Sequence, residues 1–149
     1  MAVKNPTSES VIEQLLPVVR RGGLLILVDD EDRENEGDLF VAAERATAEV
    51  INFMAGYARG LVSLALTEGR MRELGLALIA DEQGNQTKFG TAFATPIDAR
   101  EGVGSGMSAQ DRARTIAVAI TDGTQPGDLI RPGRLQTLRA VDGGVLARR

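Results

Sequence analysis

The stretch Asp29-Asp-Glu-Asp-Arg-Glu-Asn-Glu-Gly-Asp38 holds seven of the chain's 21 acidic residues within ten positions. It lies between two apolar runs, Leu24–Val28 and Leu39–Ala43. Short apolar runs of this kind predict buried strands, so we expect the acidic residues to form a loop at one edge of a sheet. Carboxylates at this density repel one another unless a positive charge lies among them.

Two explanations of this acidic loop stay open. It binds a hard cation or a polyhydroxylated, cation-bearing ligand, or it is a solvated acidic hairpin without a ligand. The chain contains no histidine and no cysteine. A metal would therefore take oxygen ligands, which favours Mg²⁺ or Mn²⁺ over zinc or copper. Proton transfer would depend on carboxylates, lysine, the single tyrosine or water.

Length and composition predict one domain. A chain of 149 residues with 43% hydrophobic content is long enough for a sizeable core. No apolar run approaches the length of a membrane span, and the N-terminus lacks the apolar core of a secretory signal. Without cysteine nothing indicates an oxidising compartment, so we expect a cytoplasmic location and no membrane partner.

The distribution of charge excludes one class of partner and favours another. Aromatic residues make up 3% of the chain, and no basic stripe interleaves with them, so we expect no nucleic-acid partner. The net charge of the chain is −4. The acidic stretch with its single arginine carries −6, so the remainder of the chain is net positive. The excess arginines lie late: Arg112, Arg114, Arg131, Arg134, Arg139, Arg148 and Arg149. They fit a small substrate with a hydroxyl-rich end and an anionic end, and equally well a scatter of surface arginines.

Helical and strand patterns alternate along the chain. Apolar spacing predicts helices over 11–19, 50–58, 68–74 and 109–120, and strands over 24–28, 39–43, 61–66, 91–97 and 135–141. This alternation predicts a single α/β or α+β domain. Arg131-Pro-Gly133 is typical of a turn.

A glycine-rich segment, Gly102–Gly106, leads into Ser108-Ala-Gln-Asp111, which predicts a capped helix N-terminus. Glycines at such a place can cradle phosphate with backbone N–H groups. The spacing matches neither a P-loop nor a dinucleotide fingerprint, and a flexible lead into the helix explains the glycines equally well.

The acidic stretch resembles the signature of the 3,4-dihydroxy-2-butanone-4-phosphate synthase family of riboflavin biosynthesis. The resemblance continues in family order through four further motifs: Gly90-Thr-Ala-Phe93, Ser108-Ala-Gln-Asp-Arg-Ala-Arg-Thr115, Arg131-Pro-Gly133 and Gly143-Gly-Val-Leu146. It implies a single α+β domain over residues 1–149, with a mixed β-sheet flanked by helices. It also implies a homodimeric, Mg²⁺-dependent lyase that converts ribulose 5-phosphate into 3,4-dihydroxy-2-butanone 4-phosphate and formate.

Carried over position by position, the resemblance assigns roles to six residues. Glu34 is expected to bind the metal and the substrate. Arg33 and Asp38 are expected to contact the sugar phosphate, and Glu36 and Asp38 to serve in proton transfer. Ser108 is expected near the site, and Arg148 to help hold the phosphate.

The chain departs from the family pattern at several positions. Arg134 stands where the family has a histidine needed for activity, and Ser63 stands where it has a cysteine. A glycine-histidine-threonine motif with a second metal ligand would follow Arg149, so the C-terminal part of the family fold is expected to be absent. Two hypotheses therefore remain: a lyase, or a catalytically impaired or divergent homologue that binds a sugar phosphate or acts as a dimer or assembly partner.

Overall fold

The structure is a computed structural model that describes residues 8–81 and 83–144. Its helices are α1 (Ser8–Arg20), α2 (Ala48–Tyr57), α3 (Glu68–Glu73) and α4 (Ala109–Ile120), with short 3-10 turns η1 (Ala43–Arg45) and η2 (Pro126–Asp128). Its strands are β1 (Leu25–Val28), β2 (Gly37–Phe40), β3 (Ser63–Leu66), β4 (Phe93–Ala99) and β5 (Leu129–Arg139). The predicted α+β class is confirmed.

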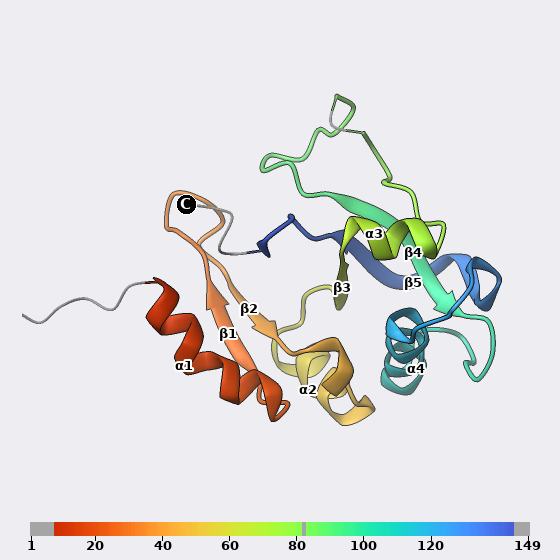
Figure 1. Cartoon of the computed structure of the whole chain (residues 1–149), viewed down its shortest axis with the longest axis horizontal. Coiled ribbons are helices and arrows are strands. Elements are labelled where there is room, and N and C mark those ends of the chain that lie inside the picture. Colours follow the sequence, from red (N-terminus) through yellow and green to blue (C-terminus); the bar gives the residue numbers. More distant parts are fainter. Residues whose placement is uncertain (1–7, 82, 145–149) are drawn as a thin grey trace, which may run out of the picture.

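The strands form two sheets (Figure 1). β1 and β2 pair antiparallel as a hairpin, with Leu25 opposite Phe40 and Val28 opposite Gly37. The other three strands lie in the order β3-β5-β4, with β3 parallel and β4 antiparallel to the central β5. The acidic stretch is the loop of the two-stranded hairpin, as its position between two apolar runs predicts.

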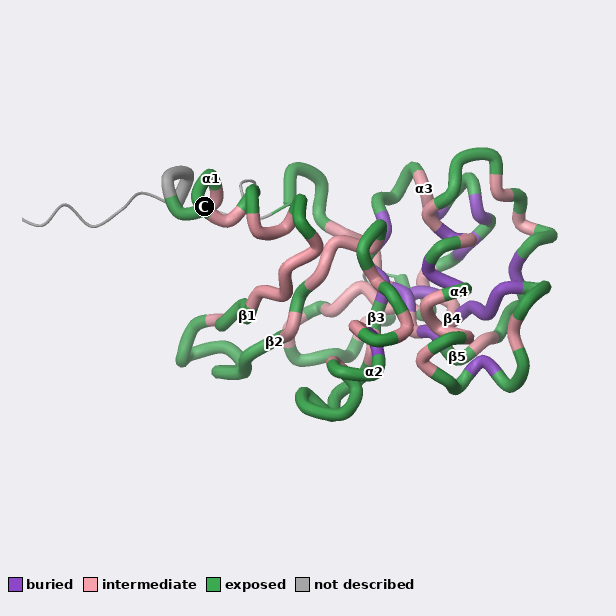
Figure 2. Tube along the Cα trace, turned by 90° about the horizontal axis from the view of Figure 1, so that it is seen from below, coloured by how far each residue is buried: buried purple, intermediate pink, exposed green. Residues whose placement is uncertain are grey.

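The hydrophobic core lies around the three-stranded sheet (Figure 2). Its buried members are Ile51, Leu64, Leu66, Met71, Leu74, Leu76, Ala94, Ile97, Ile116, Ala119, Leu129 and Leu135. The hairpin contributes none of these, and Ile26 and Val28 are each 70% exposed. The prediction of two buried strands was therefore right about the strands and wrong about their burial, because an apolar run does not reveal how many layers cover it.

Side chains fix both ends of α4. At the N-terminus the Ser108 hydroxyl accepts a hydrogen bond from the backbone N–H of Asp111 at 3.0 Å, as the sequence predicts. At the C-terminus the Arg70 guanidinium donates to the carbonyl oxygens of Ala119 at 2.9 Å and Thr121 at 2.5 Å. A cation at this end also interacts favourably with the helix dipole.

The segment Arg131-Pro-Gly133 lies inside β5, so the prediction of a turn there was wrong. The β4–β5 register shifts at this point: Ile97 is opposite Leu135, whereas the next residue, Asp98, is opposite Ile130. The intervening residues of β5 form a bulge, which accommodates a proline that cannot donate to the ladder. A Cβ on Gly133 would overlap the backbone of Ile97, so this close approach requires glycine.

Within the described ranges, no helix combines the length and apolar character needed to cross a membrane.

The contacts of Arg70 yield a stability prediction. Arg70→Ala should lower the free energy of unfolding by about 2 kcal/mol, because two carbonyls at the end of α4 lose a charged donor. Arg72→Ala is the matched control, since its side chain is 77% exposed and pairs with Glu68 on the same helix. The control should change stability by less than about 0.5 kcal/mol. Urea denaturation measures both, and equal losses would contradict the capping role.

Candidate functional site

The acidic loop is organised around the carboxylate of Asp29. One of its oxygens accepts the backbone N–H of Glu36 at 2.8 Å, and the other accepts the N–H of Glu34 at 3.0 Å. The second oxygen also accepts the Arg33 guanidinium at 2.6 Å. Asn35, with φ of 51°, makes the left-handed turn between the two donating residues. A single carboxylate thus closes the loop against the repulsion of its neighbours.

These donors shift the titration of Asp29. The backbone N–H of Glu36, followed by the N–H of Glu34 and the Arg33 guanidinium, lowers the pKa of Asp29 to about 2, although desolvation acts in the opposite direction. The carboxylates in turn raise the pKa of Arg33 above its ordinary value, with Asp29 the largest cause. The two groups therefore remain charged throughout the physiological pH range.

Arg33 is the only cation within the ten-residue loop, and it touches two carboxylates and a ring. Its Nη1 lies 2.6 Å from Asp29 Oδ2 and 2.6 Å from Glu34 Oε2. Its guanidinium carbon lies 5.1 Å from the centroid of the Phe89 ring, within cation–π range. Lys88 Nζ lies 4.7 Å from the same centroid. Arg33 thereby connects the acidic loop to a segment more than fifty positions later.

A cleft of about 470 Å³ opens beside this contact. Its lining combines charged and polar side chains with backbone from β5 and the loop before β4: Arg33, Glu68, Phe89, Gly90, Thr91, Ala92, Leu138, Arg139, Ala140, Val141 and Asp142. The lining includes two arginines and a threonine, which suit an oxyanion, and two acidic residues, which suit hydroxyl groups. We call this the Arg33 cleft.

The structure brings together four of the six predicted site residues. Arg33, Glu34 and Glu36 lie in the acidic loop, and Asp38 lies in β2 opposite Leu27. Ser108 begins α4, which lies on the opposite side of the molecule from the hairpin in Figure 1 and Figure 2, so one copy of the chain does not bring it to the loop. Arg148 lies outside the described residues. The roles of all six remain predictions.

Sequence reasoning missed the contribution of Phe89. The stretch Asp81–Lys88 has no apolar period and reads as a mobile loop, and Phe89 follows it directly. Among the residues that it describes there, the structure places no helix or regular strand, which confirms the loop; its mobility stays a prediction. The available signal was an aromatic residue isolated among polar ones and next to a lysine, which is typical of a cation–π contact.

The glycine-rich segment before α4 does not offer its N–H groups to a phosphate. Asp111 accepts the backbone N–H of Gly104 at 3.0 Å and that of Gly106 at 2.9 Å. The N–H group of Gly104, followed by that of Gly106, lowers the pKa of Asp111, although desolvation acts in the opposite direction. A carboxylate of the chain itself thus occupies the position that an external anion would take.

Next to this segment, Arg134 pairs with a buried carboxylate. Asp98 is 4% exposed and accepts the Arg134 backbone N–H at 3.0 Å and its Nη1 at 3.2 Å. A Cβ on Gly106 would lie 2.5 Å from both oxygens of Asp98, so glycine is required there. The pair is a fixed ion pair, because a guanidinium does not lose its proton in a protein.

The acidic loop offers oxygen donors suited to the expected metal, but its side chains do not converge in the geometry of a metal site. The carboxylates of the acidic loop are oxygen ligands suited to Mg²⁺. Among the residues that the structure describes, however, no group of three acidic side chains converges in a way that could hold a metal ion. Glu34, the predicted ligand, is paired with Arg33. These residues do not by themselves form a metal site.

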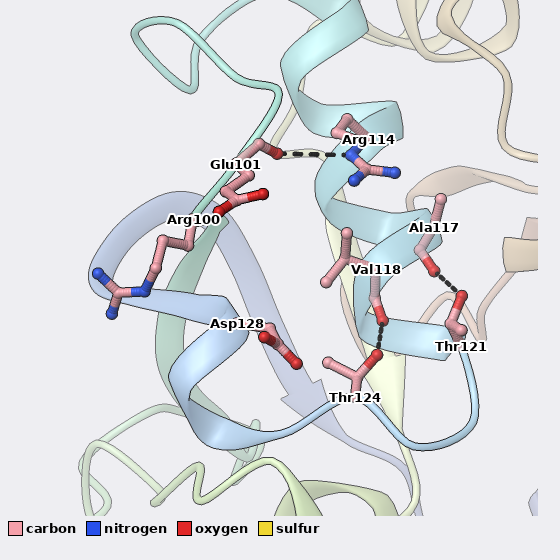
Figure 3. Close-up of a pocket in the computed structure, with 8 residues that line it drawn as sticks. All are labelled: Arg100, Glu101, Arg114, Ala117, Val118, Thr121, Thr124 and Asp128. Carbon is pink, nitrogen blue, oxygen red and sulfur yellow. Dashed lines mark hydrogen bonds between the residues drawn. The ribbon is translucent and has the colours of Figure 1, made fainter.

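A second pocket of about 270 Å³ lies between α4, η2 and the end of β4 (Figure 3). The Thr121 and Thr124 hydroxyls in its wall donate to carbonyls of α4, and Arg114 Nε donates to the Glu101 carbonyl. Its polar groups serve the local structure, and it contains none of the predicted site residues.

The hydrogen bonds to Asp29 predict a pH dependence for the loop. Because folding lowers this pKa, the contribution of Asp29 to stability is fully present above its ordinary value of 3.8 and is lost as pH falls through about 2. The Asp29 carboxyl carbon, followed by NMR, should titrate near 2 in the folded chain and near its ordinary value in urea. A folded-state midpoint near the ordinary value would contradict this arrangement.

Comparison with known proteins identifies the family. A family model described as 3,4-dihydroxy-2-butanone 4-phosphate synthase matches residues 13–149. The synthase of Pseudomonas syringae pv. tomato is 50% identical over 137 residues, which cover 92% of this chain and 37% of that protein. The synthase of Edwardsiella ictaluri is 46% identical over 138 residues, which cover 93% and 62%.

Solved structures agree. A 3,4-dihydroxy-2-butanone 4-phosphate synthase in complex with two magnesium ions matches with a TM-score of 0.85 and 37% identity over 93% of this chain and 63% of its own. A two-domain synthase from A. baumannii matches with a TM-score of 0.83 and 44% identity over 92% and 40%. The chain thus spans between about a third and two thirds of the length of these proteins. It belongs to the 3,4-dihydroxy-2-butanone 4-phosphate synthase family.

Proposed function

We propose that this chain acts in riboflavin biosynthesis as part of a lyase that converts ribulose 5-phosphate into 3,4-dihydroxy-2-butanone 4-phosphate and formate. The proposal includes Mg²⁺ or Mn²⁺ as cofactor, a homodimer as the working assembly and the cytoplasm as the location. The observation that carries it is the Arg33 cleft, where a guanidinium paired with two carboxylates faces a cavity large enough for a small sugar phosphate.

The charges of the Arg33 cleft support a phosphorylated, hydroxyl-rich ligand. Arg33 and Arg139 supply positive charge, and Thr91 supplies a hydroxyl. Glu68 and Asp142 line the same cavity and offer acceptors to sugar hydroxyls. The size of the cleft also fits, since pockets for small ligands start at about 300 Å³.

The acidic loop supports proton transfer. Opening and rearranging a ketose phosphate requires removal of a proton next to the carbonyl, which a positioned carboxylate can accept. Glu36 is anchored through its backbone N–H to Asp29, and Asp38 is held in the β1–β2 ladder. In the proposed reaction these two residues carry protons, Glu34 and Arg33 hold the substrate, and Glu34 contributes one carboxylate to the cation. Ser108 and Arg148 keep their proposed substrate contacts.

A second candidate function is a binding or assembly protein without turnover. The observation that favours it is the Asp98–Arg134 ion pair, because a permanently protonated guanidinium stands at the position after Arg131-Pro-Gly133. Such a protein would retain affinity for the sugar phosphate and lack the proton transfer that a titratable group at this position would provide.

The lyase is tested with ribulose 5-phosphate, Mg²⁺ and an assay for formate. The chain should release formate, and Glu34→Gln should lower the rate by about 100-fold or more, because the substitution removes a charged ligand of the substrate. Glu31→Gln is the matched control, since it removes the same charge from the same loop at a position with no assigned role. An equal loss in both variants would count against the role of Glu34.

The second candidate function, a binding protein without turnover, predicts a different result from the same samples. No formate from the wild-type chain, with a melting temperature that rises on addition of ribulose 5-phosphate, would replace the lyase with the binding candidate. Neither formate nor a thermal shift would contradict both.

A further inference from the structure

The two ion pairs of Arg33 use a single nitrogen of its guanidinium. Nη1 lies 2.6 Å from Asp29 Oδ2 and 2.6 Å from Glu34 Oε2. Within the described part of the chain, Nε and Nη2 have no hydrogen-bond or ion-pair partner. These two nitrogens form one edge of the planar guanidinium, and the parallel N–H groups of such an edge match two oxygens of a phosphate. Arg33 therefore retains a donor edge that the acidic loop does not use.

An aromatic ring lies against the same guanidinium. The guanidinium carbon of Arg33 lies 5.1 Å from the centroid of the Phe89 ring, and both residues line the Arg33 cleft. The attraction of a cation to a ring leaves the in-plane N–H groups of a guanidinium able to donate. An arginine side chain has many rotamers, so a contact that restricts them before the ligand arrives reduces the entropic cost of binding. The ring thus restricts the donor edge without occupying it.

Hydrogen bonds on both sides of Phe89 fix the segment that carries its ring. The Asn85 amide donates to the carbonyl oxygen of Thr91 at 3.0 Å. The side-chain oxygen of Asn85 accepts the backbone N–H of Thr87 at 3.0 Å and its hydroxyl at 2.6 Å. Gly90, with φ of 68°, donates its N–H to the Thr87 carbonyl at 3.1 Å. Phe89 is half-buried between these contacts, so the segment presents the ring at a defined place.

We propose that Phe89 is a positioning residue for the sugar phosphate: its ring orients Arg33 so that the Nε–Nη2 edge binds the phosphate group in the Arg33 cleft. Phe89 acts through Arg33 and transfers no proton. The inference rests on the proposed function only in taking a phosphorylated sugar as the ligand of the cleft. It adds a residue that belongs neither to the acidic stretch nor to the other motifs that the chain shares with its family.

Lys88 supplies a competing explanation for the ring. Its Nζ lies 4.7 Å from the same centroid, so a purely structural ring would be explained by contact with Lys88 alone. Lys88, unlike Arg33, is not among the described residues that line the Arg33 cleft. An ammonium also lacks the planar pair of N–H groups that matches a phosphate. Removal of Lys88 should therefore leave anion binding nearly unchanged, whereas removal of the Phe89 ring should weaken it.

The test is an NMR titration of the chain with inorganic phosphate, at fixed ionic strength and without metal or sugar. The backbone N–H signals of Gly90 and Thr91, which line the cleft, report binding, and the Arg33 Nε–H signal reports the donor edge. Phosphate should shift all three signals in the wild-type chain. Phe89→Leu should bind phosphate at least about fivefold more weakly, and Phe89→Tyr, which keeps a ring, should stay within about twofold of wild type.

Phe53→Leu is the matched control for the loss of a ring. Phe53 is 42% exposed, and its ring lies 4.6 Å from that of Tyr57 on α2. Phosphate affinity in Phe53→Leu and in Lys88→Gln should stay within about twofold of wild type, since salt screens a distant charge. A Phe89→Leu affinity within twofold of wild type, an equal loss in either control, or an Arg33 Nε–H signal that phosphate does not move would overturn the proposal.

Arg33→Lys tests the donor edge without altering the ring. It keeps a positive charge in the acidic loop and removes the Nε–Nη2 edge, so phosphate should bind at least about tenfold more weakly. An affinity within twofold of wild type would overturn the proposal, even if Phe89→Leu does not fold. Circular dichroism establishes which variants fold, and neither Arg33 nor Phe89 belongs to the buried core.

Kinetics with ribulose 5-phosphate and Mg²⁺ separate this proposal from the lyase. Phe89→Leu should raise KM by at least about fivefold and leave kcat within about twofold, because a contact that anchors the phosphate forms before the chemical step and persists through it. A lower kcat with an unchanged KM would contradict the positioning role. No formate from the wild-type chain counts against the lyase alone, whereas the phosphate titration requires no turnover and still tests Phe89.

Discussion

The mutual repulsion of seven carboxylates in ten positions is the constraint on which the rest of the site depends. Groups within the loop itself offset this repulsion. Asp29 gathers two backbone N–H groups and a guanidinium, and that guanidinium also neutralises Glu34. The loop is consequently ordered by internal contacts before any ligand binds. Because Arg33 pairs with both Asp29 and Glu34, the arrangement of the loop depends on the conformation of a single arginine.

The second constraint is the bulge in β5, which shapes the three-stranded sheet rather than the hairpin. Four residues of β5 lie between the partners of Ile97 and Asp98, and this offset carries Arg134 to the buried carboxylate of Asp98. Gly133 permits the close approach to the backbone of Ile97, and Gly106 leaves room for the carboxylate of Asp98. Because the carboxylate of this pair is buried, removal of either partner would strongly lower the stability of the fold. The pair therefore has a structural role that stands beside any role in chemistry.

The sequence was most informative where local chemistry decides the structure. Thr47, Thr67 and Ser108 each cap a helix through a bond to the backbone three residues later, and the cap at Ser108 is one that the sequence predicts. Burial of the hairpin and the course of β5 depend on partners distant in the chain, and these predictions failed. A proline and a glycine together are typical of a turn, and only the offset pairing with β4 reveals the bulge. The cation–π contact of Arg33 with Phe89 is likewise a tertiary feature, because its two partners lie far apart in the chain.

The central claim is that the carboxylate of Asp29 closes the acidic loop by accepting the backbone N–H groups of Glu34 and Glu36 and the guanidinium of Arg33. The most direct measurement is a crystal structure of the chain without ligand. The account predicts that both oxygens of Asp29 accept these backbone N–H groups and that Arg33 bridges Asp29 and Glu34. A loop in which the Asp29 carboxylate points away from Glu34 and Glu36 would contradict it.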